Sequence, residues 1–183
     1  PFRFAGLNSN RITHGLRFDA PEEFEVRDPA SYMAALRSRK ILLDPAERRQ
    51  AIATQVKAVT SSTGGVEKLD EGLLDEVTNL VEAPSAFLGK FDPAFLSLPA
   101  EVLVSVMKKH QRYFPVWGQD GRLLSCFVVV RNGDDHNLEV VADGNEQVIR
   151  ARFADADFFI REDLQQKLSD YLPRLGTLLF QKK

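Results

Sequence analysis

The sequence predicts an α/β protein with α and β elements in mixed layers: a mixed sheet, flanking helices and a long C-terminal helix. Acid–proline pairs recur before apolar segments of helical spacing, and an aspartate cap followed by proline is typical of a helix start. These pairs are Asp28-Pro29, Asp44-Pro45 and Asp92-Pro93. Short apolar or alternating runs lie between the helical segments, which indicates strands. From Asn145 onward the helical periodicity is the clearest in the chain.

Composition places the chain among ordinary globular domains. Its 183 residues are 44% hydrophobic and 27% charged, enough for one sizeable core or two small ones. The net charge of −2 argues against a dedicated nucleic-acid module, which is usually basic, without excluding a local basic surface. The single cysteine, Cys126, excludes a disulfide framework and a cysteine zinc site, and we expect a small buried hydrophobe there.

The sequence contains no membrane-span pattern, and no signal peptide is found at its start. No apolar run approaches the roughly 20 residues of a membrane span, and no signal peptide opens the chain. Because the chain starts at Pro1 and its helical pattern continues toward Lys183, we expect a piece of a longer cytoplasmic polypeptide. We expect one α/β domain over residues 1–183, or that domain with a helical extension over residues 143–183.

The first 27 residues mix turn formers with short apolar segments. Residues 11–13 and 16–18 are expected to form a short strand pair or an extended loop. Arg11 and Arg17 bracket a glycine and a histidine there, an arrangement that either cups a phosphate or lies in a solvated loop. Residues 23–27 alternate as a strand with one polar side does.

Two helices with a short strand between them come next. The first starts at Asp28-Pro29, and the apolar residues 41–43 predict a short buried strand after it. The second starts at Asp44-Pro45 with Glu47 three residues after the cap, a pattern like a capping box. It ends in the segment 61–65.

The middle of the chain is organised around a helix that begins at a proline. We expect a short helix over residues 71–76, a short strand at residues 80–81 and a turn at residues 89–90. Pro99 suits a first helical position, and Ser97 lies before it as a capping hydroxyl.

A hairpin and the long helix follow. Residues 118–121 are a strong turn signal, and the apolar run 123–130 indicates a strand covered on both faces. The long helix is expected to bend near Arg161 and to break at Pro173. Its expected apolar stripe consists of Val148, Ile149, Phe153, Ala156 and Phe159.

Two sets of side chains are candidate nucleic-acid contacts. The first is the cluster Lys108, Lys109, His110, Gln111, Arg112 and Tyr113, with Phe114 next to it. Cations beside aromatic rings suit an RNA backbone with an unstacked base, and the alternatives are a helix cap or a subunit interface. The second set is Arg150 and Arg152, followed by Arg161. Glu146 lies four residues before Arg150, so an ion-paired, solvated helix face is the alternative.

No standard catalytic motif is present. The chain has no glycine-rich phosphate loop, no Gly-x-Ser-x-Gly elbow and no histidine pair at i, i+4. The turn-rich segment 131–137 follows a central strand, where α/β folds often bind ligands, and its side chains include Asn132, Asp134, Asp135 and His136. Such groups are also common in surface loops. We therefore predict no catalytic residue, no metal site and no cofactor in this segment.

Four runs identify a resemblance. They are SNRITHGLRF (with Ser31-Tyr32 after it), NLVEAPSAFLGKFD, LPAEVLVSVMKKHQRYFPV and DGNEQVIRARFADADFF. In this order they resemble the beta chain of the bacterial heterotetrameric glycyl-tRNA synthetase, over nearly the whole sequence. One position departs from the family pattern, because Leu16 stands where that pattern has a histidine after Gly15. The presence of His14 two residues earlier does not show that it takes the place of that histidine.

The resemblance implies an enzyme that joins glycine to its tRNA with ATP, through a glycyl-adenylate. It assigns ATP and Mg²⁺ to the separate alpha subunit, in a cytoplasmic heterotetramer of two alpha and two beta chains with no membrane contact. It also implies a fold similar to the editing-type domain of the phenylalanyl-tRNA synthetase beta chain.

Three functional hypotheses follow. The first is a non-catalytic domain for tRNA binding and subunit assembly. The second is a hydrolytic domain that deacylates mischarged tRNA, with His110, Glu82 and Asn132 as its groups. The third is a protein–protein spacer without RNA contact.

Overall fold

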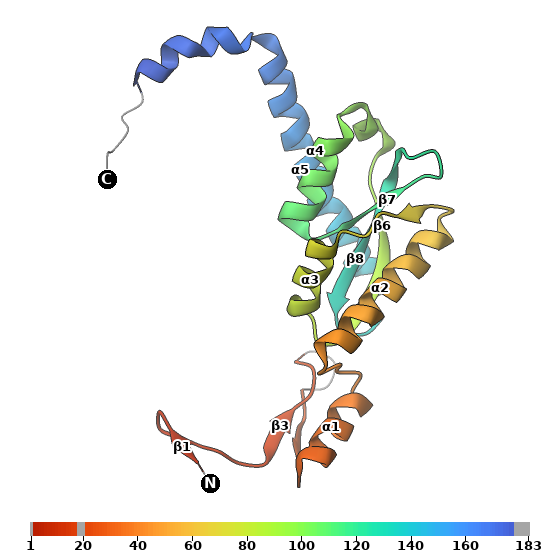
Figure 1. The fold of residues 1–183 in the computed structure, drawn as a ribbon, viewed down its shortest axis with the longest axis vertical. Coiled ribbons are helices and arrows are strands. Elements are labelled where there is room, and N and C mark those ends of the chain that lie inside the picture. The colour runs from red at the N-terminus through yellow and green to blue at the C-terminus, as the bar shows by residue number, and fades with distance from the viewer. Residues whose placement is uncertain (1, 18–20, 178–183) are drawn as a thin grey trace.

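A computed structural model describes residues 2–17 and 21–177 (Figure 1). Its strands are β1 Arg3–Phe4, β2 Leu7–Asn8, β3 Ile12–His14, β4 Glu23–Glu25, β5 Val66–Glu67, β6 Pro84–Lys90, β7 Phe114–Trp117 and β8 Leu123–Asn132. Its α-helices are α1 Pro29–Ser38, α2 Pro45–Ser62, α3 Glu71–Leu80, α4 Ala100–Val106 and α5 Leu138–Gln165. Further helical turns are η1 Pro93–Ser97, the π-helical η2 Met107–Gln111 and η3 Leu168–Thr177.

The mixed α/β fold is confirmed, and its centre is a four-stranded sheet between two helical layers. The strand order is β5-β7-β8-β6, with every neighbouring pair antiparallel. Along β8, Cys126 and Val128 pack with α2 and α3, whereas Phe127 and Val129 pack with α4 and α5. Alternate side chains of a strand point to opposite faces. The prediction that this strand is covered on both faces is therefore confirmed.

Gly89 brings β6 close to a fully buried aromatic ring of the core, that of Phe127. A Cβ built on Gly89 would lie 2.5 Å from the Phe127 ring, so a glycine is needed at this point of the strand. Phe127 is fully buried and stacks against Tyr113 and Phe91. The predicted turn at residues 89–90 is therefore wrong, because both residues belong to β6 and pair with β8.

Aspartate caps start the helices as the acid–proline pairs predict. Asp28, Asp44 and Asp92 each accept hydrogen bonds from first-turn N–H groups. The Ser31 N–H donates to Asp28 Oδ1 at 2.7 Å, and this bond is the main cause that holds the pKa of Asp28 below the usual aspartate value. The expected Ser97 cap is wrong, because the Ser97 hydroxyl donates to the Ala94 carbonyl oxygen.

Two predicted strands are wrong, and the strand pair that was one alternative for residues 11–18 does not form among the described residues of that range. Residues 80–81 lie at the end of helix α3. The apolar residues 41–43 form a loop, in which the Ile41 N–H donates to the Leu36 carbonyl and the Leu42 N–H donates to the Glu82 carbonyl. Residues 16–17 also lie outside strands, since β3 pairs instead with β4. Phe18, the last residue of that expected pair, lies outside the described residues. Leu16, Ile41 and Ala83, all in loops, are buried in a small cluster with Leu36 of α1, whereas Leu43 and Leu80 are exposed.

Side chains cover the outer edge of β6. The Gln55 side chain, on α2, donates its Nε2 to the Pro84 carbonyl (3.0 Å) and accepts the Ala86 N–H with its Oε1 (2.8 Å). Farther along, Glu146 on α5 accepts the Lys90 N–H (2.8 Å). Backbone groups on this edge are therefore satisfied by helices from both layers.

The long helix is confirmed, but it starts at Leu138 rather than at Asn145. Ile149 and Phe153 are fully buried, whereas Phe159 is 62% exposed because the second half of α5 projects beyond the sheet (Figure 1). The helix continues through Arg161, where a bend was predicted, and ends at Gln165 with Gln166 extended. Pro173 lies within η3.

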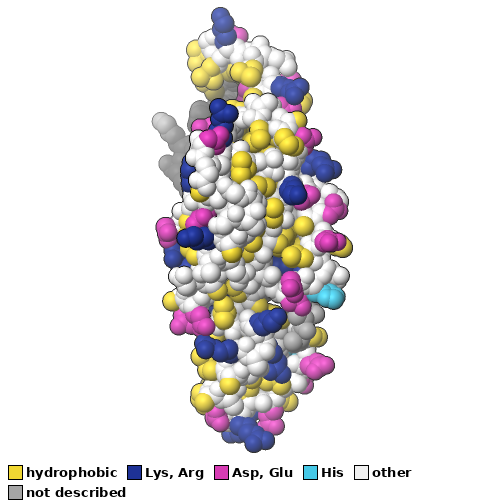
Figure 2. All heavy atoms as spheres, turned by 90° about the vertical axis from the view of Figure 1, so that its right-hand side faces the viewer, with side chains coloured by type: hydrophobic (Ala, Val, Ile, Leu, Met, Phe, Trp, Pro, Cys, Tyr) yellow, Lys and Arg dark blue, Asp and Glu magenta, His cyan; other side chains and the backbone are white. Residues whose placement is uncertain are grey.

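One face of the molecule carries charged and apolar side chains without a large region of a single kind (Figure 2). Figure 2 shows cationic and anionic side chains interspersed with apolar ones over the face that it displays. None of the helices within 2–17 and 21–177 combines the length and the apolar character that crossing a membrane requires.

Candidate nucleic-acid interface and an adjoining cavity

The predicted cation cluster lies where α4 passes into β7. The helix widens into the π turn η2, Arg112 then takes a left-handed conformation (φ 57°), and β7 begins two residues later. Met107 at the start of the turn is fully buried, which fixes the turn against the core. Single π turns often occur at functional sites.

Two cations of the cluster are paired with helix α3. The Lys108 ammonium lies 2.7 Å from the Asp70 carboxylate, and the Arg112 guanidinium lies 2.7 Å from that of Glu76. The hydrogen bond from Lys108, with a further one from the Leu73 N–H, holds the pKa of Asp70 below its usual value. Lys108 and Arg112 therefore fasten the end of α4 to α3, and their charges are largely compensated there.

Tyr113 belongs to the core. Its side chain is 4% exposed, its ring stacks on Phe127 with a centroid distance of 4.6 Å, and its hydroxyl donates to Asn145 Oδ1 at 2.6 Å. Burial raises the pKa of Tyr113 to about 12. A base cannot stack on this ring in the folded protein. Of the cluster, Lys109, His110 and the ion-paired Arg112 are exposed, and Lys108 and Gln111 are half-buried.

Arg150 and Arg152 are both exposed on α5, yet they lie on opposite flanks of it. At 3.6 residues per turn, two residues two positions apart point about 160° away from each other around the helix. The expected ion pair of Glu146 with Arg150 is wrong, because the Glu146 carboxylate instead accepts a hydrogen bond from the Lys90 N–H. Arg161 is paired with Asp157 at 2.8 Å.

The groups proposed for hydrolysis are not assembled. Asn132 Oδ1 accepts hydrogen bonds from the N–H groups of Glu82 and Ala83, both at 2.9 Å, so this side chain holds the connection between α3 and β6. Glu82 and His110 are exposed, and in the described ranges no hydrogen bond or ion pair joins them. Nor do residues 2–17 and 21–177 contain a group of three or more His, Cys, Asp or Glu side chains placed to hold a metal ion.

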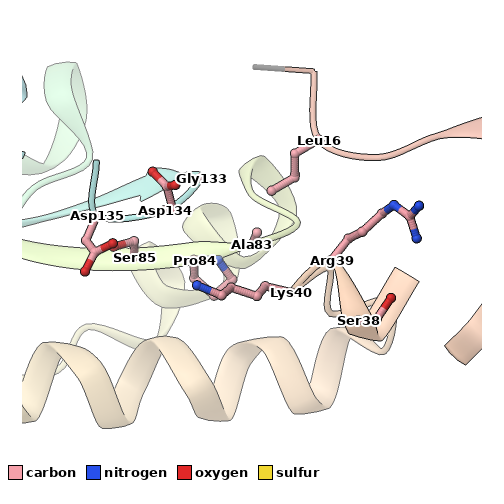
Figure 3. Close-up of a pocket in the computed structure, with 10 residues that line it drawn as sticks. All are labelled: Leu16, Ser38, Arg39, Lys40, Ala83, Pro84, Ser85, Gly133, Asp134 and Asp135. Atoms are coloured by element: carbon pink, nitrogen blue, oxygen red, sulfur yellow. The ribbon is translucent and has the colours of Figure 1, made fainter. Parts of the chain in front are cut away.

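A cavity of about 370 Å³ lies at the C-terminal end of β8, beside the end of α1 (Figure 3). The charged groups along it are Arg39 and Lys40 after α1, and Asp134 and Asp135 after β8. The loop after β8 was a predicted ligand position. The basic side was missed, because sequence gives no sign that residues 39–40 meet this loop. Leu16, at the position that departs from the family pattern, forms part of its wall.

Comparisons with known proteins agree over the whole chain. Residues 1–183 match the family model described as glycyl-tRNA synthetase beta subunit. The chain is 46% identical to a glycine–tRNA ligase beta subunit of Desulforamulus reducens over 180 residues, covering 98% of this chain and 26% of that protein. It is 43% identical to proteins of that name from Listeria monocytogenes serotype 4a and Moorella thermoacetica, covering 100% of this chain and 26% of each relative. The chain therefore spans about a quarter of the length of these curated relatives.

Proposed function

Because the chain belongs to the family of glycyl-tRNA synthetase beta subunits, we propose that it is part of a glycine–tRNA ligase. That enzyme attaches glycine to its tRNA with ATP. In this proposal the segment is non-catalytic and serves assembly and tRNA binding, while ATP and Mg²⁺ act at the alpha subunit. The complex contains two alpha and two beta chains and works in the cytoplasm.

The observation that carries the assembly role is an uncovered apolar surface. It runs along the second half of α5 and along η3, and consists of Phe158, Phe159, Leu164, Leu168, Leu172 and Leu175. Leu164 and Leu168 are 81% and 89% exposed. Several large apolar side chains at that exposure along one segment are typical of a region that another protein segment covers. In the proposed enzyme, that segment belongs to the remaining part of the beta chain or to the alpha subunit.

The tRNA role has a narrower basis, the exposed cations at the end of α4. Lys109 and His110 are exposed beside the ion-paired Lys108 and Arg112. With a net charge of −2, any RNA contact of this segment is local. Lys109 is therefore the side chain on which we place a phosphate contact.

Assembly is tested in the complete beta chain with its alpha subunit. The double variant Leu164→Ser/Leu168→Ser should weaken the complex in analytical ultracentrifugation or lower the melting temperature of the complete chain. Val140→Ser is the matched control, because Val140 is a single apolar side chain, 73% exposed, on the first turn of the same helix. If the double variant behaves like the control in both measurements, the assembly role fails.

tRNA binding is tested on the same complex across a salt series. Lys109→Ala should weaken binding and reduce the slope of log K against log salt by about 0.7 to 0.9, the value for one phosphate contact. Arg122→Ala is the control, since Arg122 is 87% exposed in the turn between β7 and β8. An unchanged slope for Lys109→Ala would remove the tRNA contact from this surface.

A further inference from the structure

We propose that the cavity between the end of α1 and the loop after β8 binds a small zwitterionic ligand of the amino-acid class. Lys40 meets the anionic group of the ligand and Asp135 meets its ammonium group. The binding chemistry is independent of the proposed function, which enters only in the choice of ligand source: a free amino acid or the aminoacylated end of an RNA.

The backbone at the end of α1 places Lys40 in the cavity. Lys40 has φ 61°, a left-handed conformation that turns the chain sharply after the helix. Figure 3 shows its side chain running beside Pro84, toward Ser85. Within the described residues, no hydrogen bond or ion pair occupies the Lys40 ammonium. It is a free cation that faces a cavity.

Arg39 also lines the cavity, but its guanidinium is bound to other groups. Its guanidinium lies 3.7 Å from the centroid of the Phe24 ring and donates a hydrogen bond to the Ala35 carbonyl at 3.1 Å. In Figure 3 the guanidinium points away from Ser85 and Asp135. Arg39 therefore forms the rim of the cavity and adds positive potential, and Lys40 is the group that reaches the ligand.

The opposite side is held by the end of β8. The Gly133 N–H donates to the Ala83 carbonyl at 2.8 Å, and Asp134 Oδ1 accepts the His136 N–H at 2.8 Å. These bonds fix the loop that carries Asp135. The Asp135 carboxylate lies beside Ser85 (Figure 3) and, like Lys40, has no partner among the described residues.

The two free charges decide the class of ligand. Lys40 and Asp135 line one cavity without forming an ion pair, so a ligand that carries both charges satisfies both groups at once. A phosphate alone would meet the repulsion of Asp134 and Asp135, and a metal cation alone would meet that of Lys40. The volume of about 370 Å³ is near the lower end for ligand pockets, which fits a single amino acid or one aminoacylated nucleotide, whose phosphate supplies the anionic group.

Two distant stretches of sequence supply the remaining wall. Leu16 comes from the run SNRITHGLRF, and Ala83, Pro84 and Ser85 come from the run NLVEAPSAFLGKFD. Both runs carry the family resemblance, and the fold brings them together at this cavity. Leu16 is buried and apolar, so the side chain of the ligand meets a hydrophobic surface there.

The experiment is calorimetric titration of the complete protein with glycine and L-alanine, and with ethylamine and acetate as singly charged probes. The amino acids should bind more tightly than either singly charged probe. Lys40→Gln and Asp135→Asn should each weaken amino-acid binding roughly tenfold, the effect of one charge-assisted hydrogen bond. The matched controls are Arg122→Gln and Asp120→Asn, from an exposed ion pair in the β7–β8 turn, and should leave the affinity unchanged.

A second arm distinguishes the two ligand sources. Glycylated and uncharged forms of a short RNA acceptor stem are compared in the same titration. Tighter binding of the glycylated form, lost in Asp135→Asn, assigns the cavity to the charged RNA end; otherwise a free amino acid is its ligand. If neither amino acids nor glycylated RNA bind, or if Lys40→Gln and Asp135→Asn match the controls, the inference is wrong. Assembly and the salt series test the proposed function separately, so either can fail while the other stands.

Discussion

Replacing Lys108 by Met should destabilise the protein without changing its affinity for RNA. The substitution removes the 2.7 Å ion pair with Asp70 and keeps most of the side-chain volume. The two side chains are 29% and 38% exposed, so the pair ranks with partly screened surface pairs, worth up to about 1 kcal/mol. For a chain of this length that loss lowers the melting temperature by about 2–4 °C.

The neighbouring Lys109 provides the matched comparison. Lys109 is exposed, and Lys109→Met should change the free energy of unfolding by less than about 0.5 kcal/mol. Urea denaturation followed by circular dichroism measures the unfolding free energy of both variants. Titration with tRNA across a salt series measures how their affinity for tRNA depends on salt. Lys108→Met should keep the wild-type salt slope, whereas Lys109→Met should reduce it.

The ion pair also predicts a pH dependence. The folded protein holds the pKa of Asp70 below its usual value, so the stabilisation is present above the unfolded pKa of about 3.9 and is lost as pH falls through the lowered folded value. The difference in unfolding free energy between wild type and Lys108→Met should therefore narrow as pH is lowered from 7 toward 3. Equal costs for Lys108→Met and Lys109→Met, or a gap that widens in acid, would refute this reasoning.

Three further predictions concern the core. Gly89→Ala should cost more than about 2 kcal/mol in urea denaturation, because its Cβ would lie 2.5 Å from the Phe127 ring; a cost below 1 kcal/mol would mean that the strands separate easily. Tyr113→Phe should lower the unfolding free energy by about 1–2 kcal/mol, because it leaves Asn145 Oδ1 without its donor. Spectrophotometric titration should find a pKa of about 12 for the Tyr113 phenol. Because this pKa is raised in the folded protein, stability should fall as pH rises from 10 toward 12. Thr60→Val should be neutral or raise the melting temperature, since the buried Thr60 hydroxyl has no partner within the described chain. A loss above about 1 kcal/mol in unfolding free energy would contradict this expectation.

Helix starts could be predicted because capping is local. Asp28, Asp44 and Asp92 each act on N–H groups within three residues, so sequence contains both partners. The strand 123–130 could be predicted for a similar reason, since a continuous apolar run needs cover on both faces. The runs at 41–43 and 80–81 look similar locally, but the first is a loop in which Ile41 is buried and Leu43 is exposed. The second is the end of α3, where Val81 is buried and Leu80 is exposed.

The candidate site was harder to predict because its partners are distant in sequence. Lys108 and Arg112 are paired with residues 38 and 36 positions earlier, and Tyr113 is bonded to a residue 32 positions later. A run of cations therefore looked like one surface, although the fold uses two of them to join helices. The residues that line the cavity likewise come from the end of a helix and the end of a strand, which only the tertiary structure places together.

The covered edge of β6 determines how this segment can meet its partners. Gln55 and Glu146 already bond the outward groups of Pro84, Ala86 and Lys90, and β5 at the other edge of the sheet is two residues long. An extended peptide joining the sheet would have to displace these bonds or find very little edge to bind. We therefore expect partners to dock through side chains on helices, and the segment to resist the strand-by-strand stacking that leads to aggregation.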